Sequence, residues 1–200
     1  MKTLMMFLAT ILFFACENVE NTASNDEDKG ITSKEEFNDL SIYNIPSVWT
    51  TQHNEQIEFK DLQGSVLAVV MVYTSCQTAC PRLAADMRNI EEQVAEKGKE
   101  NVKYVLVSID PENDTPERLT QFGKDYQLEG DQWLFLRGTE ETVREFANIV
   151  AVKYKQISPI DFSHSNIISV FDTEGVMQHQ QEGLGVNNKE TIEKIIELSN

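Results

Sequence analysis

The sequence predicts an α/β fold in which a central mixed sheet is flanked by helices and followed by a C-terminal β-hairpin and a closing helix. Two continuous apolar runs rich in β-branched residues, at residues 66–73 and 104–109, are typical of strands buried on both faces. Apolar residues at helical spacing follow each run. Near the C-terminus, the turn segment DTEG (residues 172–175) separates two strand-like segments and predicts a hairpin.

Capping residues mark where the helices begin. The first helix is expected to begin at Pro81, with Cys80 as its cap, and to end at Gly98. Thr115 is followed by a proline, a combination typical of an N-cap and the first helical position. Thr139 caps a third helix, which carries two glutamates at its positive end.

The remaining segments complete the order of elements. A short strand is expected at residues 133–136, and residues 166–171 and 176–181 form the arms of the hairpin, with Gly175 taking a positive φ. Isoleucines at helical spacing predict the closing helix. A β-α-β half, a further helix, an antiparallel hairpin and a last helix follow one another in the thioredoxin-like order. We expect this single domain to span residues 41–200.

The N-terminal segment reads as a targeting signal rather than as part of the fold. The apolar run at residues 4–15 contains one polar residue and is shorter than the about 20 residues a spanning helix needs. It ends in Ala15-Cys16, which resembles a bacterial lipoprotein cleavage site, so residues 1–16 are expected to be a signal peptide ending at a lipidated Cys16. Ordinary cleavage nearby and an uncleaved short anchor are the alternatives.

Residues 17–40 contain eight acidic side chains, two lysines and few large apolar residues, so we expect a disordered tether. We therefore expect a membrane-anchored lipoprotein, held through its lipid on the extracytoplasmic side of a bacterial cell envelope.

The net charge excludes some partners. The chain has 17 basic and 33 acidic residues, giving a formal net charge of −16. A nucleic-acid partner is excluded because binding phosphates requires a basic face. Electrostatic docking on anionic lipid is disfavoured for the same reason.

Two cysteines occupy the turn between the first buried strand and the helix that follows. Cys76 and Cys80 lie four residues apart, and Pro81 places them at the positive end of that helix. Both thiols are expected to ionise readily there, and thiolates attack disulfides, form one with each other or bind a soft metal. The alternative is that they are two small buried hydrophobic residues.

A histidine supplies a third ligand atom. His164 is expected in the loop just before residues 166–171, which faces the cysteine turn in a thioredoxin-like fold. Two thiolates and one imidazole form an open, soft site that suits copper, Cu(I) or Cu(II), whereas structural zinc takes four ligands. His53 and His179 are not positioned to complete the set.

The chain resembles the Sco/SenC family, copper-binding thioredoxin-fold proteins involved in assembling cytochrome c oxidase. Three blocks carry the resemblance: YTSCQTACP (residues 73–81), SIDPENDTPERL (residues 108–119) and HSNIISVFDTEG (residues 164–175). The resemblance implies that Cys76, Cys80 and His164 are the copper ligands.

Two further features of these blocks bear on the site. Asp110 and Asp114 match acidic positions of the family. We expect their main role to be shaping the loop, and a lesser role to be contacting a partner protein or the metal ligands. Gln77-Thr78 stands where many members carry Pro-Asp, a difference that would alter copper affinity or the redox potential of the dithiol.

Two classes of function follow. The first is a metallochaperone that delivers copper to the binuclear copper site of cytochrome c oxidase subunit II or of another copper-receiving protein. The second is an enzyme, a thiol-disulfide reductase with Cys76 and Cys80 as its redox pair, which keeps a partner's copper-binding cysteines reduced. The first is favoured because His164 has no evident duty in disulfide exchange. A peroxidase is disfavoured because Tyr73 stands where peroxiredoxins carry threonine. In the oxidised, metal-free protein, Cys76 and Cys80 are expected to form a reversible disulfide.

Overall fold

The computed structural model describes residues 37–200. The predicted signal peptide, its Cys16 and the predicted tether up to residue 36 lie outside the described residues. The strands of the described part are β1 (Val48–Thr51), β2 (Gln56–Glu58), β3 (Val66–Val72), β4 (Val102–Ser108), β5 (Trp133–Arg137), β6 (Tyr154–Ser158), β7 (Asp161–His164), β8 (Ile167–Phe171) and β9 (Met177–Glu182). The helices are α1 (Ala79–Ala95), α2 (Pro116–Asp125), α3 (Glu140–Ile149) and α4 (Lys189–Leu198), with 3-10 turns η1 (Ile42–Asn44) and η2 (Phe59–Leu62).

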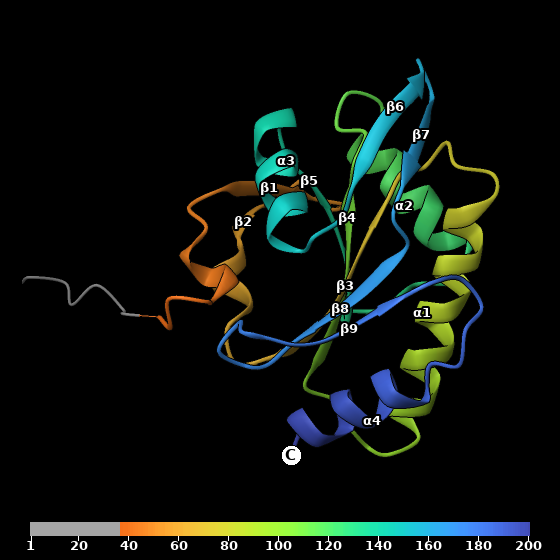
Figure 1. The fold of residues 1–200 in the computed structure, drawn as a ribbon. Coiled ribbons are helices and arrows are strands. Elements are labelled where there is room, and N and C mark those ends of the chain that lie inside the picture. The colour runs from red at the N-terminus through yellow and green to blue at the C-terminus, as the bar shows by residue number, and fades with distance from the viewer. Residues whose placement is uncertain (1–36) are drawn as a thin grey trace, which may run out of the picture. The chain divides into compact units, whose positions relative to one another are not determined.

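Seven strands form one mixed sheet in the order β2-β1-β5-β4-β3-β8-β9 (Figure 1). β3, β4 and β5 run parallel, as a β-α-β connection requires. β8 pairs antiparallel with both β3 and β9, and α4 closes the domain beside α1. The predicted thioredoxin-like fold class is thereby confirmed.

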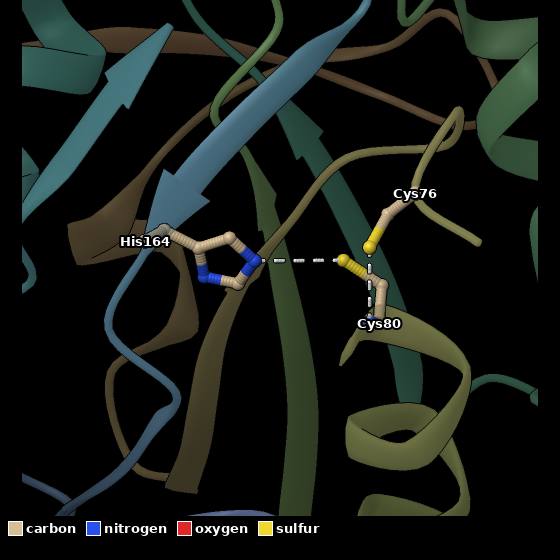
Figure 2. A group of neighbouring side chains, drawn as sticks. All are labelled: Cys76, Cys80 and His164. Atoms are coloured by element: carbon tan, nitrogen blue, oxygen red, sulfur yellow. Dashed lines mark hydrogen bonds between the residues drawn. The ribbon is translucent and has the colours of Figure 1, made fainter. Parts of the chain in front are cut away.

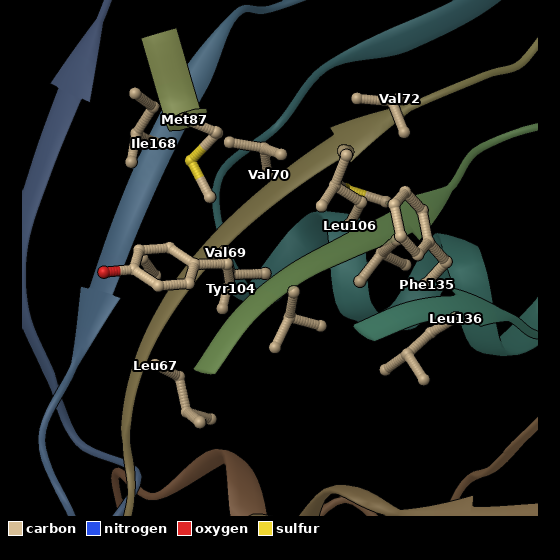
Figure 3. Packing of buried hydrophobic residues seen from close by; sticks show 14 of the residues in the cluster. Leu67, Val69, Val70, Val72, Met87, Tyr104, Leu106, Phe135, Leu136 and Ile168 are labelled. Atoms are coloured by element: carbon tan, nitrogen blue, oxygen red, sulfur yellow. The ribbon is translucent and has the colours of Figure 1, made fainter. Parts of the chain in front are cut away.

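The core lies around the parallel strands. All seven residues of β3 are buried, as the continuous apolar run predicted. Met87 of α1 belongs to the same buried cluster as Val70 and Ile168, and Phe135 lies near Leu106 on the neighbouring strand (Figure 3). Burying each such side chain contributes roughly 1.5–3 kcal/mol, so this layer fixes the sheet that positions the site.

An aromatic cluster anchors the β1–β2 edge, which the sequence did not predict. Trp49 and Phe59 are fully buried, and their ring centroids lie 5.5 Å apart. Phe146 of α3 stacks on Phe59 with a centroid distance of 4.8 Å. β1 and β2 contain four and three residues, too few for a periodic pattern, so packing rather than local sequence defines them.

The predicted caps of α2 and α3 and the predicted hairpin turn are confirmed. The Thr115 hydroxyl accepts the backbone N–H of Arg118 at the start of α2. Thr139 and Thr142 exchange reciprocal hydrogen bonds at the start of α3. Gly175 has a φ of 74°, the left-handed conformation expected in the β8–β9 turn.

The start of α1 differs from the prediction. The helix begins at Ala79, so Cys80 lies inside its first turn instead of capping it. Pro81 is tolerated there because backbone N–H groups of the first turn have no partner within the helix. The Cys76 sulfur accepts the Cys80 N–H at 3.2 Å and so satisfies one of them.

Candidate metal centre

The three predicted ligands come together at one end of the sheet. Cys76 lies in the turn after β3, Cys80 in the first turn of α1, and His164 at the end of β7 (Figure 2). Their ligand atoms all lie within 4.8 Å of one another, and the Cys80 sulfur is 3.8 Å from His164 Nε2. Among residues 37–200, no other His, Cys, Asp or Glu joins this group.

The other two histidines lie elsewhere, as predicted. His179 on β9 places its Nε2 3.0 Å from the Thr191 hydroxyl of α4. His53 is exposed in the turn between β1 and β2.

One prediction about His164 was wrong in detail. The residue is not in a loop but ends β7, the second arm of a hairpin that forms its own two-stranded sheet with β6. The strands are short and mostly exposed, so the signal was weak. Pro159, which follows β6 in the turn to β7, was the available sequence cue.

The two thiols differ in their acidity, whereas the sequence had indicated that both would be acidic. The pKa of Cys76 is lowered to about 4, first because the Cys80 thiol donates a hydrogen bond to its sulfur. The backbone N–H groups of Cys80 and Thr78 add to that effect and outweigh burial, which acts in the opposite direction. The pKa of Cys80 is raised, because its proton is held by Cys76 and because the residue is fully buried.

The orientation of the imidazole follows from one hydrogen bond. His164 Nδ1 lies 2.9 Å from the carbonyl oxygen of Ser165, which can only accept, so Nδ1 carries the proton in the neutral ring. The lone pair of Nε2 is then directed toward the sulfurs, which is how a metal-binding histidine is normally fixed.

Asp114 holds the cysteine turn from the side of the β4–α2 loop. It is fully buried and accepts hydrogen bonds from the Thr74 N–H at 3.1 Å and from the Thr74 and Ser108 hydroxyls, each at 2.5 Å. Burial raises the pKa of Asp114, although these bonds act against the rise. Asp110 accepts from the Asn113 side chain at 2.9 Å within the same loop. The predicted loop-shaping role is confirmed for both.

The donor set fits a soft metal. Metal–sulfur and metal–nitrogen bonds of about 2.0–2.3 Å place ligand atoms up to roughly 4 Å apart, so three atoms within 4.8 Å need only small shifts. Two sulfurs and one imidazole suit copper, and three ligands leave a position open. Both cysteines are free thiols in this structure, and their reversible disulfide stays a prediction.

Comparison with known proteins gives a consistent result. A family model described as SCO1/SenC matches residues 41–200. The SCO1 protein homolog of Bacillus subtilis (strain 168) is 31% identical over 103 residues, which are 51% of this chain and 53% of that protein. The match therefore spans about half the length of that relative.

Solved structures share the fold. A SCO1/SenC family lipoprotein from Bacillus anthracis str. Ames superposes with a TM-score of 0.71 at 24% identity, covering 76% of this chain and 92% of that one. BsSco, a Sco-family cytochrome c oxidase assembly protein with a disulfide switch, superposes with a TM-score of 0.69 at 23% identity. The match covers 82% of this chain and 98% of BsSco. Copper-bound ScoI of Arabidopsis thaliana superposes with a TM-score of 0.67 at 17% identity, covering 76% of this chain and 94% of that one.

Within residues 37–200, each helix is too short or too polar to cross a lipid bilayer.

Proposed function

Because the chain belongs to the SCO1/SenC family, we propose that it is a copper chaperone that holds one copper ion through Cys76, Cys80 and His164. The observation that carries the proposal is the convergence of two sulfurs and one imidazole nitrogen within 4.8 Å. Thiolates favour Cu(I), and the imidazole adds a ligand that also suits Cu(II). The copper-bound Arabidopsis neighbour supports copper as the cargo.

The open coordination position explains delivery. A ligand from an acceptor enters it, and the three ligands of this chain then leave in turn, so copper moves without a change of oxidation state. We propose the binuclear copper site of cytochrome c oxidase subunit II as the acceptor. The description of BsSco as a cytochrome c oxidase assembly protein supports this choice.

We propose that the chain acts outside the cytoplasm, held at a bacterial membrane by a lipid on Cys16 and by the tether that follows. The lipoprotein neighbour from Bacillus anthracis supports this location. Changing Cys16 to Ser should leave unprocessed precursor. Normal processing of that variant would contradict lipidation at Cys16.

The second candidate is the thiol-disulfide reductase, which the low pKa of Cys76 favours. The Cys76 thiolate would attack a partner's disulfide and release one partner sulfur as a thiolate. Cys80 would then lose its proton and attack Cys76, releasing the second partner sulfur and closing the Cys76–Cys80 disulfide. The partner gains two electrons, and this chain loses two.

Copper titration separates the two functions. The reduced chain from Glu17 onward is titrated with Cu(I) against a competing chelator, and its Cu(II) complex is followed by visible spectroscopy. His164→Ala should weaken Cu(II) binding and change the spectrum while Cu(I) binding partly survives. Replacing Cys76 or Cys80 with Ser should remove tight binding of both ions.

His179→Ala is the matched control, because His179 contacts α4 and lies outside the site. An unchanged Cu(II) spectrum and affinity in His164→Ala would contradict the three-ligand site. Absence of copper binding in the unaltered chain, combined with a reducing dithiol potential, would favour the reductase.

A further inference from the structure

We propose that Tyr73 and Asp161 are positioning residues that hold His164 beside the two cysteines. Each lies three positions before a proposed ligand, Tyr73 before Cys76 and Asp161 before His164. The inference deepens the proposed copper function and rests on it for the role of His164.

The hydroxyl of Tyr73 joins the two ligand-bearing segments directly. Tyr73 Oη donates to Asp161 Oδ1 at 2.5 Å, a charge-assisted hydrogen bond of the stronger kind. The same oxygen accepts the backbone N–H of Phe162 at 3.3 Å. One buried side chain at the end of β3 is therefore bonded to both the side chain and the backbone of β7.

The ring of Tyr73 adds contacts of its own. Its centroid lies 5.7 Å from that of the His164 imidazole and 5.2 Å from that of Phe162, both in edge-to-face arrangements. The Ser75 hydroxyl donates to the Ile160 carbonyl at 2.9 Å, a further bond from the cysteine turn to the hairpin. The segment 73–75 thus holds the hairpin at both the first residue of β7 and the turn before it.

The hairpin needs such support. β6 and β7 pair only with each other among the described strands, and isolated two-stranded hairpins are marginal in water. His164 also borders an open cavity of about 430 Å³, which Lys153, Ser163 and Asn166 line as well. The Tyr73 hydrogen bonds therefore help to set the distance from His164 to Cys80, together with the packing of Tyr154 and Phe162 against the core.

The larger consequence falls on His164, although the Tyr73 side chain also helps to lower the pKa of Cys76. If the hydroxyl is lost, the hairpin and its imidazole are free to move away, whereas the two sulfurs stay on the turn and on α1. Binding of Cu(II), which needs the imidazole, should weaken more than binding of Cu(I), which the two thiolates hold.

Tyr73→Phe is the sharpest test, because it keeps the buried ring and removes only the hydroxyl. Cu(II) affinity should fall by about 10- to 100-fold, the scale of a lost hydrogen bond to a charged group, with a changed visible and electron paramagnetic resonance spectrum. Cu(I) affinity should fall by less than Cu(II) affinity, because both sulfurs stay in place. Asp161→Ala should behave like Tyr73→Phe, whereas Asp161→Asn keeps an acceptor oxygen and should stay close to the unaltered protein.

Tyr154→Phe is the matched control, because Tyr154 lies opposite His164 on β6 and contributes no hydrogen bond to this contact. Its copper affinities should be those of the unaltered chain. An equal loss of Cu(I) and Cu(II) affinity in Tyr73→Phe would overturn the proposal, since it would indicate general damage to the site.

A metal-free measurement separates this proposal from the proposed function. In the apo protein, Tyr73→Phe should speed hydrogen exchange of the β6 and β7 amides, with Phe162 as the direct reporter. Unchanged exchange would overturn the positioning role whether or not the protein binds copper. If the unaltered chain bound no copper, the chaperone function would fail, while faster exchange in the variant would still support the contact.

Discussion

Replacing Asp114 with alanine tests how the cysteine turn is held. The carboxylate is fully buried and bridges the β4–α2 loop to the residue two positions before Cys76. Alanine removes every acceptor oxygen and leaves the half-buried Thr74 N–H without its partner. Asparagine is the matched variant, because its side chain can still accept from Thr74 and can donate to the Ser108 hydroxyl.

The expected cost follows from these bonds. An orphaned buried N–H costs about 1–3 kcal/mol, and each lost hydrogen bond to a charged group is worth about 1.5–3 kcal/mol before offsets. Burial raises the pKa of Asp114, so its charged form is disfavoured in the folded protein. Removing this carboxylate therefore offsets part of the loss in stability. We therefore expect Asp114→Ala to lower the free energy of unfolding by about 2–4 kcal/mol and Asp114→Asn by about 1 kcal/mol.

Urea denaturation followed by circular dichroism measures the difference. With a slope of about 2 kcal/mol/M, the midpoint of Asp114→Ala should fall by about 1–2 M. A midpoint within about 0.3 M of the unaltered chain would refute the reasoning, because the slope converts that shift to well under 1 kcal/mol.

The pH dependence provides a second measurement on the same residue. Because the pKa of Asp114 is raised in the folded state, the folded chain binds a proton more readily than the unfolded chain. As pH rises from the unfolded pKa of about 3.9 through the raised folded value, the unaltered chain should lose stability relative to Asp114→Asn. If the difference in unfolding free energy between the unaltered chain and Asp114→Asn stayed constant over this pH range, a buried carboxyl that ionises there would be contradicted.

Three further changes test the core, the hairpin turn and the thiols. Phe146→Ala should cost about 3–5 kcal/mol in urea denaturation, because the ring is fully buried in the aromatic cluster, and a loss under about 1 kcal/mol would contradict that packing. Gly175→Ala should lower the melting temperature, because φ is 74° and a built Cβ would lie 2.7 Å from the Ser41 hydroxyl; an unchanged temperature would count against that geometry. Iodoacetamide should alkylate Cys76 before Cys80 at pH 6, with the Cys76 rate falling only as pH drops below about 4, and equal rates at the two thiols would contradict their difference in pKa.

The parts of the fold that could be predicted are those that local sequence determines. The run at residues 66–73 is apolar throughout because β3 is covered on both faces, and a cap such as Thr139 satisfies helix N–H groups wherever the helix is placed. β1 and the β6–β7 hairpin are short and partly polar, and contacts from distant segments stabilise them. Trp49 of β1 depends on Phe146, almost one hundred residues away, which no local pattern reveals.

The site divides in the same way. The identity of the ligands follows from residue type and from topology, because a soft metal needs sulfur and the fold brings one end of the sheet together. The difference between the thiols depends on which sulfur holds the shared proton, which is set by the direction of the hydrogen bond between them. The same holds for Tyr73, whose role depends on the position of Asp161, and for Asp114, whose bond to Thr74 crosses between two loops.

The three residues before Cys76 explain how one turn is supported on two sides. Thr74 is bonded to the buried Asp114, whereas Tyr73 and Ser75 are bonded to the half-exposed hairpin that carries His164. The two supports therefore act mainly on different ligands, although Tyr73 also contributes to the low pKa of Cys76. Loss of the Asp114 carboxylate should displace the sulfurs and weaken the binding of Cu(I) and Cu(II) together. Loss of the Tyr73 hydroxyl should weaken the binding of Cu(II) more than that of Cu(I). Identical copper affinities in the two variants would mean that the turn and the hairpin move as one unit, which the separate hydrogen-bond sets argue against.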